Sequence, residues 1–394
     1  MEGGAHVTKR ANNEGSIYWD EKRKRFIGQF SYKEAETGKI KRKKITGTQK
    51  TKVLREGKAF LDNIAKQAQI SSAVLLKNFI NNWLENTVKP TVRIKTYERY
   101  ECAIRRHIIP YIGDLALVEI KRENLQKYLS DLKERGNCKG GALSATTVNA
   151  VRRLLKTAMN VAVGDGLIST NPVEQTKAMR TMKHPIKIFS EEDYKKILAT
   201  AKAHSTKSYL IMRLAFETGF RIGEIFGLEY GAVDFSERII CVRQTIVSTK
   251  HGKKLQIMAK NSSSIRSIKV SQKLIDELKY FQSLHTIRKE KLKNKYEQEH
   301  DFIIENIDGS FCDPAYFSDK VFKKVLLKRA GLSQEYRMHD CRHTHASWLI
   351  AKGVKPIVIS KRLGHKSIRT TLDIYSHLIS STEEEAVQAL ENVL

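Results

Sequence analysis

The pattern of apolar residues changes twice along the chain, and the first change closes a small mixed segment. Residues 16–19, 26–30 and 41–45 show the short, turn-bounded patterns of strands. Residues 51–66 then repeat apolar side chains at the 3.6-residue spacing of a helix. These patterns predict a three-stranded sheet followed by a helix, a unit that occupies residues 1–72.

The second change separates an all-helical segment, residues 73–176, from a mixed segment, residues 184–394, and a basic linker joins the two. Apolar spacing in the helical segment predicts helices at 74–85, 96–109, 124–133 and 145–164. The last segment is mainly helical, with short strands predicted at 238–247, 255–259 and 264–270. A chain of 394 residues is too long for one ordinary domain. The fold class is therefore multidomain and mainly α, with small β-sheets and a mixed α/β C-terminal unit.

The charge of the chain indicates a polyanionic partner. Lys and Arg number 71 against 43 Asp and Glu, which gives a net charge of +28 and an isoelectric point near 9.8. Such an excess of positive charge favours binding to nucleic acid. An anionic membrane is the alternative, but no apolar stretch approaches the ~18 residues that a spanning helix needs. A basic protein associated with RNA or the ribosome also fits this composition.

Both of the first two segments carry clusters of basic residues. A basic sheet could lie in a DNA groove, and basic helices could clamp a duplex by its phosphates, although solvated basic faces would look the same. The candidate contacts are Arg23, Lys24, Arg25, Lys41, Arg42, Lys43, Arg99, Arg105, Arg106, Arg152 and Arg153.

The sequence predicts neither a structural metal nor a cofactor. The five cysteines form no CxxC pair and are odd in number, which argues against a zinc ribbon or a disulfide framework and fits a reducing cytosol. There is no secretory signal pattern, no phosphate-binding glycine motif and no carboxylate pair typical of a two-metal nuclease. His339, His343 and His345 could suggest zinc, but the HExxH spacing is absent.

Phosphate chemistry without a metal needs cationic side chains, and the last segment supplies a suitable set. Arg221 precedes Glu224 by three residues, and His339 precedes Arg342 by the same spacing, which places each pair on one face of a helix. His365 follows a Leu-Gly dipeptide, and Tyr375 lies ten residues later. Each piece alone has an ordinary structural explanation. Together they form a plausible constellation for phosphoryl transfer, because the planar fork of Arg binds two phosphate oxygens.

In this order and spacing, residues 339–345, 363–365 and 370–377 resemble the tyrosine recombinase (integrase) family. The resemblance covers the whole C-terminal segment. The three-part layout also resembles integrases of phages and conjugative transposons. It implies an arm-type DNA-binding domain at 1–72, a core-binding domain at 73–176 and a catalytic domain at 184–394.

The resemblance also implies a role for each motif residue. Arg221 and Arg342 would hold the scissile phosphate, and His365 would donate a hydrogen bond to it. Lys260 would protonate the leaving 5′ oxygen, and His339 would help to deprotonate the tyrosine. Tyr375 would be the nucleophile, with Glu224 behind the site as the group that orders it.

By this resemblance the protein is a site-specific DNA recombinase that integrates and excises a mobile element through a 3′-phosphotyrosyl intermediate, without a cofactor. Its partners would be duplex DNA at core and arm-type sites, further copies of itself in a tetramer, and an excisionase or DNA-bending host protein. No membrane is involved, and a bacterial cytoplasm is expected. The alternatives are a Xer-like resolvase of chromosomes or plasmids, a relaxing topoisomerase of related chemistry, and a catalytically silent DNA-binding relative.

A capping pattern at 381–384 predicts a short terminal helix with an apolar stripe. Such a helix is too short to be stable alone, so the stripe must dock on another surface. Docking on its own catalytic domain and docking on a neighbouring protomer both remain open.

Overall fold

The chain divides into two compact units, residues 1–183 and 184–394. The computed structural model describes residues 16–33, 40–137, 141–182, 185–258, 265–297, 299–375, 387, 390 and 391. Lys260 lies outside the described residues, and so does nearly all of the expected terminal helix. No helix among the described residues is long and apolar enough to cross a membrane.

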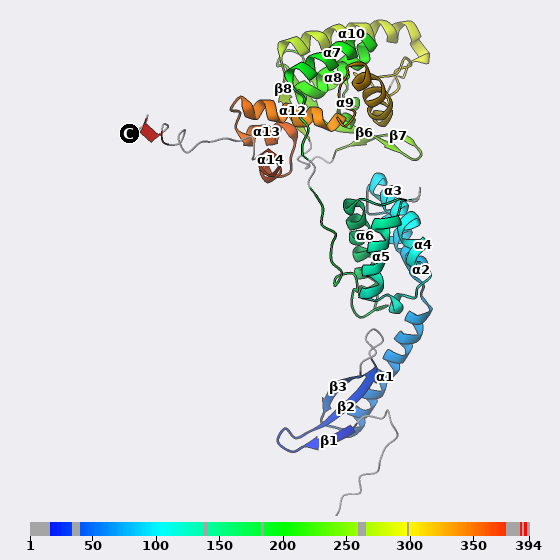
Figure 1. Cartoon of the computed structure of the whole chain (residues 1–394). Helices are drawn as coiled ribbons and strands as arrows, with labels where there is room; N and C mark the ends of the chain where they lie inside the picture. Colours follow the sequence, from blue (N-terminus) through cyan, green and yellow to red (C-terminus); the bar gives the residue numbers. More distant parts are fainter. Residues whose placement is uncertain are drawn as a thin grey trace, which may run out of the picture. The chain divides into compact units, whose positions relative to one another are not determined.

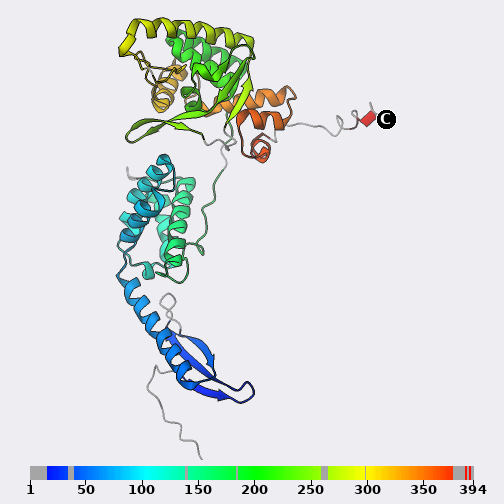
Figure 2. The same ribbon diagram turned by 180° about the vertical axis from the view of Figure 1, so that it is seen from behind.

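The N-terminal unit opens with an antiparallel sheet in the order β1-β2-β3, against which one long helix packs (Figures 1 and 2). The elements are β1 (Ser16–Asp20), β2 (Arg25–Lys33), β3 (Ile40–Gly47) and α1 (Lys50–Ala73). Phe30 on β2 and Val53 on α1 are fully buried between the sheet and the helix. The predicted sheet and helix are confirmed, although α1 continues beyond the predicted end at residue 66.

The rest of this unit is helical and has a separate apolar core. Its elements are α2 (Leu76–Trp83), η1 (Leu84–Val88), α3 (Ile94–Ala103), η2 (Ile104–Ile108), α4 (Ile109–Ile112), η3 (Leu117–Glu119), α5 (Arg122–Arg135) and α6 (Ala145–Gly164). Ser144 caps α6 by accepting a hydrogen bond from the backbone N–H of Thr147 at 3.2 Å. Val151, Leu155 and Ala158 of α6 then fall on the buried face.

The C-terminal unit packs helices around two small sheets. Its helices are α7 (Glu191–His204), α8 (Thr206–Thr218), α9 (Ile222–Phe226), η4 (Tyr230–Ala232), α10 (Gln272–Leu292), η5 (Lys293–Lys295), α11 (Pro314–Tyr316), η6 (Phe317–Leu327), α12 (Met338–Ala351), α13 (Pro356–Leu363) and α14 (Ile368–Tyr375). Its strands are β4 (Val233–Asp234), β5 (Ile239–Val242), β6 (Gln244–Thr249), β7 (Gly252–Ile257) and β8 (Arg266–Lys269). The helices α12, α13 and α14 form the orange group in Figure 1, and α12 packs against α8.

The strand predicted at 238–247 is two strands, which is a correction. β5 pairs with β4 and β8, whereas β6 pairs with β7 in a separate hairpin. The chain passes from one sheet to the other at Arg243, an exposed residue whose carbonyl accepts a hydrogen bond from the N–H of Met258. Alternation of side chains continues through such a junction, so the apolar pattern could not reveal the change of partner.

Gly57 allows α1 to approach the sheet closely. A Cβ atom at this position would overlap the ring of Phe30. Replacing Gly57 with Ala gains about 1 kcal/mol of helix propensity. Overpacking a buried ring costs about 1–3 kcal/mol, so the two effects compete directly at this residue.

We predict that Gly57→Ala destabilises the sheet and speeds amide hydrogen exchange in β2 and β3, because the fully buried ring of Phe30 would have to shift to make room for the new Cβ. The control is Gly164→Ala on α6, where a new Cβ meets nothing within 4 Å. That variant should slow exchange locally or leave it unchanged. Unchanged exchange in β2 and β3 of Gly57→Ala would show that the ring can relax.

Candidate active site

Two helix-ending turns carry two of the predicted catalytic residues. Helix α8 ends at Gly219, with φ of +65°, and Arg221 follows two residues later. Helix α13 ends at Gly364, with φ of +69°, and His365 is the next residue. Both glycines adopt the left-handed conformation that side chains disfavour. A Cβ on Gly219 would also lie 2.7 Å from the His345 ring, so this turn has no space for one.

Arg342 of α12 joins the two turns. Its Nη1 donates to the carbonyl oxygen of Gly219 at 2.9 Å, and its Nη2 donates to that of Leu363 at 2.6 Å. The side chain is buried, and burial together with the charge of Arg221 lowers its pKa to about 9. Arg342 therefore remains charged at neutral pH and fixes the separation of the two turns.

Glu224 is the buried acid of the site. Its Oε1 lies 2.7 Å from Nη1 of Arg221, and its Oε2 lies 2.7 Å from Nη2 of Arg266. Burial alone would raise the pKa of Glu224, but the hydrogen bond and charge of Arg266 and the charge of Arg221 outweigh it and hold the pKa below its usual value. The Arg221 side chain remains 43% exposed, so its remaining N–H groups can reach a ligand.

A second arginine clamp fastens α13 to the rest of the unit. Arg362 donates from Nε to Nε2 of His345 at 3.1 Å, and its two other nitrogens donate to the carbonyls of Lys269 and Glu217. Nδ1 of His345 lies 2.8 Å from the carbonyl oxygen of Phe216. Since a carbonyl only accepts and a guanidinium only donates, His345 is a neutral imidazole with its proton on Nδ1. Burial and the charge of Arg362 lower the pKa of His345 to about 3, in agreement with this arrangement.

Tyr375 ends α14 and lies inside the unit, 1% exposed, among Ala346, Ile359 and other apolar residues. Its hydroxyl oxygen is 2.7 Å from Nδ1 of His343. Burial raises the pKa of Tyr375, against the opposing charge of Arg342, so the phenol is neutral. His343 was not among the catalytic residues predicted from the sequence, where its only signal was its place directly after Arg342.

The other two histidines lie near the same charges. The ring of His339 meets that of His343 edge to face, with centroids 4.8 Å apart. His365 places Nδ1 2.8 Å from the hydroxyl of Thr371. The pKa of each is lowered to about 4, first by desolvation and then by positive charges that include Arg342 and Arg221. Part of the His339 side chain is exposed at the surface, although the surrounding protein desolvates its ring, and its imidazole, like that of His365, is neutral at pH 7.

The structure thus brings six predicted residues into one electrostatic cluster: Arg221, Glu224, His339, Arg342, His365 and Tyr375. Arg266 and Arg362 join them as positioning groups that no sequence motif indicated. Arg342 lies close enough to Tyr375 for its charge to act on the phenol, and Arg221 lies near Arg342.

Nine of the eleven predicted DNA contacts are exposed, namely Arg23, Lys24, Lys41, Arg42, Lys43, Arg99, Arg105, Arg106 and Arg153. Arg25 is half-buried on β2. Arg152 is also half-buried, and it donates to the hydroxyl and carbonyl of Thr176 at 2.7 and 2.6 Å. Arg152 therefore fastens the loop after α6 to that helix.

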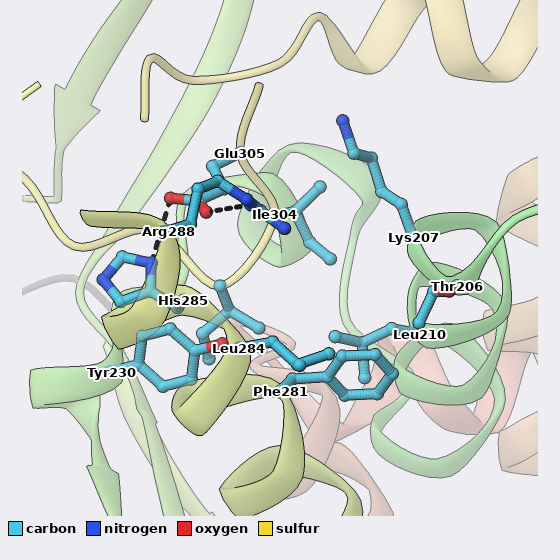
Figure 3. Close-up of a pocket in the computed structure, with 11 residues that line it drawn as sticks. Thr206, Lys207, Leu210, Tyr230, Phe281, Leu284, His285, Arg288, Ile304 and Glu305 are labelled. Atoms are coloured by element: carbon cyan, nitrogen blue, oxygen red, sulfur yellow. Dashed lines mark hydrogen bonds and ion pairs between the residues drawn. The ribbon is translucent and has the colours of Figure 1, made fainter. Parts of the chain in front are cut away.

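A cavity of about 140 Å³ in the C-terminal unit contains none of the predicted residues (Figure 3). On its wall Glu305 accepts from Arg288 at 2.5 Å and lies 3.1 Å from Nδ1 of His285. These polar groups satisfy one another, and apolar side chains such as Leu210 and Phe281 line the rest of the cavity. We assign this cluster to the stability of the unit.

Comparisons with known proteins show the family of the chain. The profile of the Phage integrase family matches residues 187–381, and that of the phage integrase N-terminal SAM-like domain matches residues 75–133. A tyrosine recombinase XerC-like protein of Caldanaerobacter subterraneus is 30% identical over 380 residues, which cover 91% of this chain and 93% of the relative. The chain belongs to the tyrosine recombinase family. It is a tyrosine-type site-specific recombinase.

Further relatives of this recombinase include integrases. The ICEBs1 integrase of Bacillus subtilis is 26% identical and is aligned over 90% of this chain and 93% of its own length. Among solved structures, the Tn1549 transposon integrase superposes with a TM-score of 0.66 at 19% identity, over 82% of this chain and all of that chain. A lambda integrase dimer superposes with a TM-score of 0.58 at 19% identity, over 95% of this chain and 97% of that chain. These two structures share the fold of the recombinase.

We predict that Glu224→Gln destabilises the C-terminal unit by about 3 kcal/mol at pH 7, because it removes the buried charge between two arginines. The folded pKa of Glu224 is depressed below its ordinary value of 4.5, so its stabilisation is present above that value. The stabilisation is lost as the pH falls through the folded pKa, and the gap between wild type and variant should close there. Urea unfolding followed by the ¹⁹F resonance of fluorinated Trp348 would measure the gap.

Glu192→Gln is the matched control, since this carboxylate is 76% exposed and pairs with Lys196 one turn away. Its loss should change stability by less than about 0.5 kcal/mol. A Glu224→Gln gap that widened on acidification would contradict the assigned pKa direction.

Proposed function

We propose that the protein is the integrase of a mobile genetic element, which cuts and rejoins duplex DNA through a covalent bond between Tyr375 and a DNA 3′ phosphate. The observation that carries the proposal is the cluster itself, in which Arg221, Arg342 and His365 share one electrostatic environment with the hydroxyl of Tyr375. A bacterial integrase and an Enterococcus faecalis transposase of transposon Tn916, each 26% identical, support the link to mobile elements.

In the proposed reaction the oxygen of Tyr375 attacks the scissile phosphorus, and the bond to the 5′ oxygen breaks. Arg221 and Arg342 stabilise the negative charge of the pentacoordinate transition state, and His365 donates a hydrogen bond to the same phosphate. The resemblance to the family assigns protonation of the leaving oxygen to Lys260. The phosphotyrosyl ester keeps the energy of the broken bond, so rejoining is the reverse step and requires no nucleotide cofactor.

Three segments of the chain would share the binding of DNA. We assign residues 1–72 to arm-type sites, where the exposed basic residues of β3 and of the turn before β2 suit phosphate contacts, and residues 73–176 to the core site. Residues 184–394 would hold the scissile phosphate. A tetramer on two duplexes is the expected assembly, and a lambda integrase tetramer bound to a Holliday junction shares this fold. An excisionase or DNA-bending protein would be a further partner, in a bacterial cytoplasm beside the nucleoid.

Resolution of chromosome or plasmid dimers is a second candidate function, because the 30% identical relative is described as XerC-like. The sheet and α1 at the N-terminus favour integration, since this extra basic unit offers a second DNA-binding surface. Recombination of a circular element with a target duplex would identify an integrase. Recombination restricted to two identical sites on one circle would identify a resolvase.

We predict that Tyr375→Phe abolishes covalent attachment to DNA and leaves DNA binding intact, because only the nucleophilic oxygen is removed. The core site is first located by footprinting the protein on the DNA that flanks its own gene. The protein is then incubated with a nicked duplex that carries this site, and a denaturing gel detects the covalent adduct. An adduct formed by the variant would refute Tyr375 as nucleophile. A wild-type protein without an adduct would indicate the catalytically silent relative instead.

We predict that Arg221→Ala slows adduct formation by about 100-fold or more, the effect of removing one preorganised donor to the transition state. Arg221→Lys should restore little of this rate, because an ammonium lacks the planar fork. Arg329→Ala, a change at an exposed arginine outside the cluster, controls for lost surface charge. Equal rates for the Arg221→Ala and Arg329→Ala proteins would remove Arg221 from the mechanism.

A further inference from the structure

The hydroxyl of Tyr375 has a direct hydrogen-bond partner that the recombinase motif does not name. Its oxygen is 2.7 Å from Nδ1 of His343, and the two rings are 5.9 Å apart. His339, the residue to which the family resemblance gives proton removal, contacts the ring of His343 edge to face. His343 is thus the imidazole in contact with the reacting oxygen.

The direction of this hydrogen bond follows from the protonation states. Tyr375 is a neutral phenol, because its pKa is raised by burial, so its O–H donates. His343 is neutral as well, since burial lowers its pKa, and Nδ1 accepts while the ring proton resides on Nε2. A neutral base that already accepts the hydrogen bond of the nucleophile is the starting arrangement for general-base catalysis.

The charges around the three histidines differ in one respect. The charges that act most strongly on His339 are those of Arg221, Arg337 and Arg342, and His365 has a similar set in Arg221, Arg266 and Arg342. His343 faces Arg337 and Arg342 but also the carboxylate of Asp340, one turn earlier on α12. An imidazolium is therefore supported by a negative charge at position 343. An imidazolium at position 339 would lie in the first turn of α12, where the helix dipole disfavours a positive charge.

Asp340 is placed to supply that charge. It is 1% exposed, and its Oδ2 accepts from the backbone N–H of Arg337 at 2.8 Å. Its Oδ1 is buried and has no hydrogen-bond partner among the described residues. A buried carboxylate oxygen without a partner is costly unless a positive charge develops beside it.

We propose that His343 is the general base of the reaction and that Asp340 stabilises its protonated form; the inference rests on the proposed function of Tyr375. As the phenolic oxygen attacks the phosphorus, its proton moves to Nδ1 of His343. The new bond joins oxygen to phosphorus, the bond to the 5′ oxygen breaks, and the leaving oxygen takes a proton from a separate acid. In the rejoining step, His343 returns its proton to Tyr375. His339 then remains free to bind the phosphate.

The test compares His343→Asn with His339→Asn in the full-length protein. The amide oxygen introduced by His343→Asn would still accept the hydrogen bond of Tyr375 near the place of Nδ1, but it cannot take the proton. Single-turnover adduct formation on the nicked core duplex should slow by about 100- to 10,000-fold, the range for a lost general base. DNA binding, measured by gel shift, should be unchanged.

Fluorinated tyrosines at position 375 separate a base from a structural support. Lowering the pKa of the phenol reduces the need for proton removal, so the rate of His343→Asn should rise steeply with fluorination. His339→Asn should show no such rescue. In Asp340→Asn the loss of the carboxylate lowers the pKa of His343, so the acid limb of the pH–rate profile should move to lower pH.

Two results would overturn the assignment. One is a His343→Asn protein that forms the adduct at the wild-type rate. The other is a slow His343→Asn protein that fluorination leaves unchanged while it rescues His339→Asn. In either case the wild-type adduct at Tyr375 reports separately on the proposed function, so failure of the base assignment leaves that function intact.

Discussion

The geometry of the recombinase site depends on the guanidinium of Arg342, held between the carbonyls of Gly219 and Leu363. Each carbonyl belongs to the end of a helix, where backbone oxygens lack partners within the helix and the dipole favours a cation. One buried side chain therefore satisfies two helix ends and fixes the distance between the turns that carry Arg221 and His365. It also remains positive beside the nucleophile, so the same group serves structure and chemistry.

Such a concentration of arginines would repel itself without an acid within it. Glu224 supplies that acid, since it contacts Arg221 and Arg266 and is itself 2% exposed. Arg266 in turn donates to the carbonyl of Arg362 at 2.7 Å, which ties β8 to the end of α13. One buried carboxylate thus organises cations from two elements while leaving Arg221 open to solvent. The arrangement is preorganised for an anion, and charge stabilisation then requires little rearrangement.

The buried position of Tyr375 adds a constraint on access. Its ring packs in a small apolar cluster of α12, α13 and α14, and its hydroxyl is held by His343. The hydrogen bond satisfies a polar group that burial would otherwise penalise. The same contact orients the nucleophile and supplies the base that we propose, so α14 must present the oxygen to the phosphate while this pair stays together.

The sequence by itself determined the fold class, and its motifs indicated six residues that the structure brings near one another, because helix and strand periods and short motifs are local properties. It also placed Arg221 and His365 after glycines whose positive φ is a local requirement. Only the tertiary structure decided which side chains meet. Arg362 and His345 are 17 residues apart and Arg266 and Glu224 are 42 apart, and no local pattern encodes such contacts. The break between β5 and β6 also depends on packing between distant elements, which sequence spacing does not determine. The same holds for the hydrogen bond that Tyr375 forms with His343.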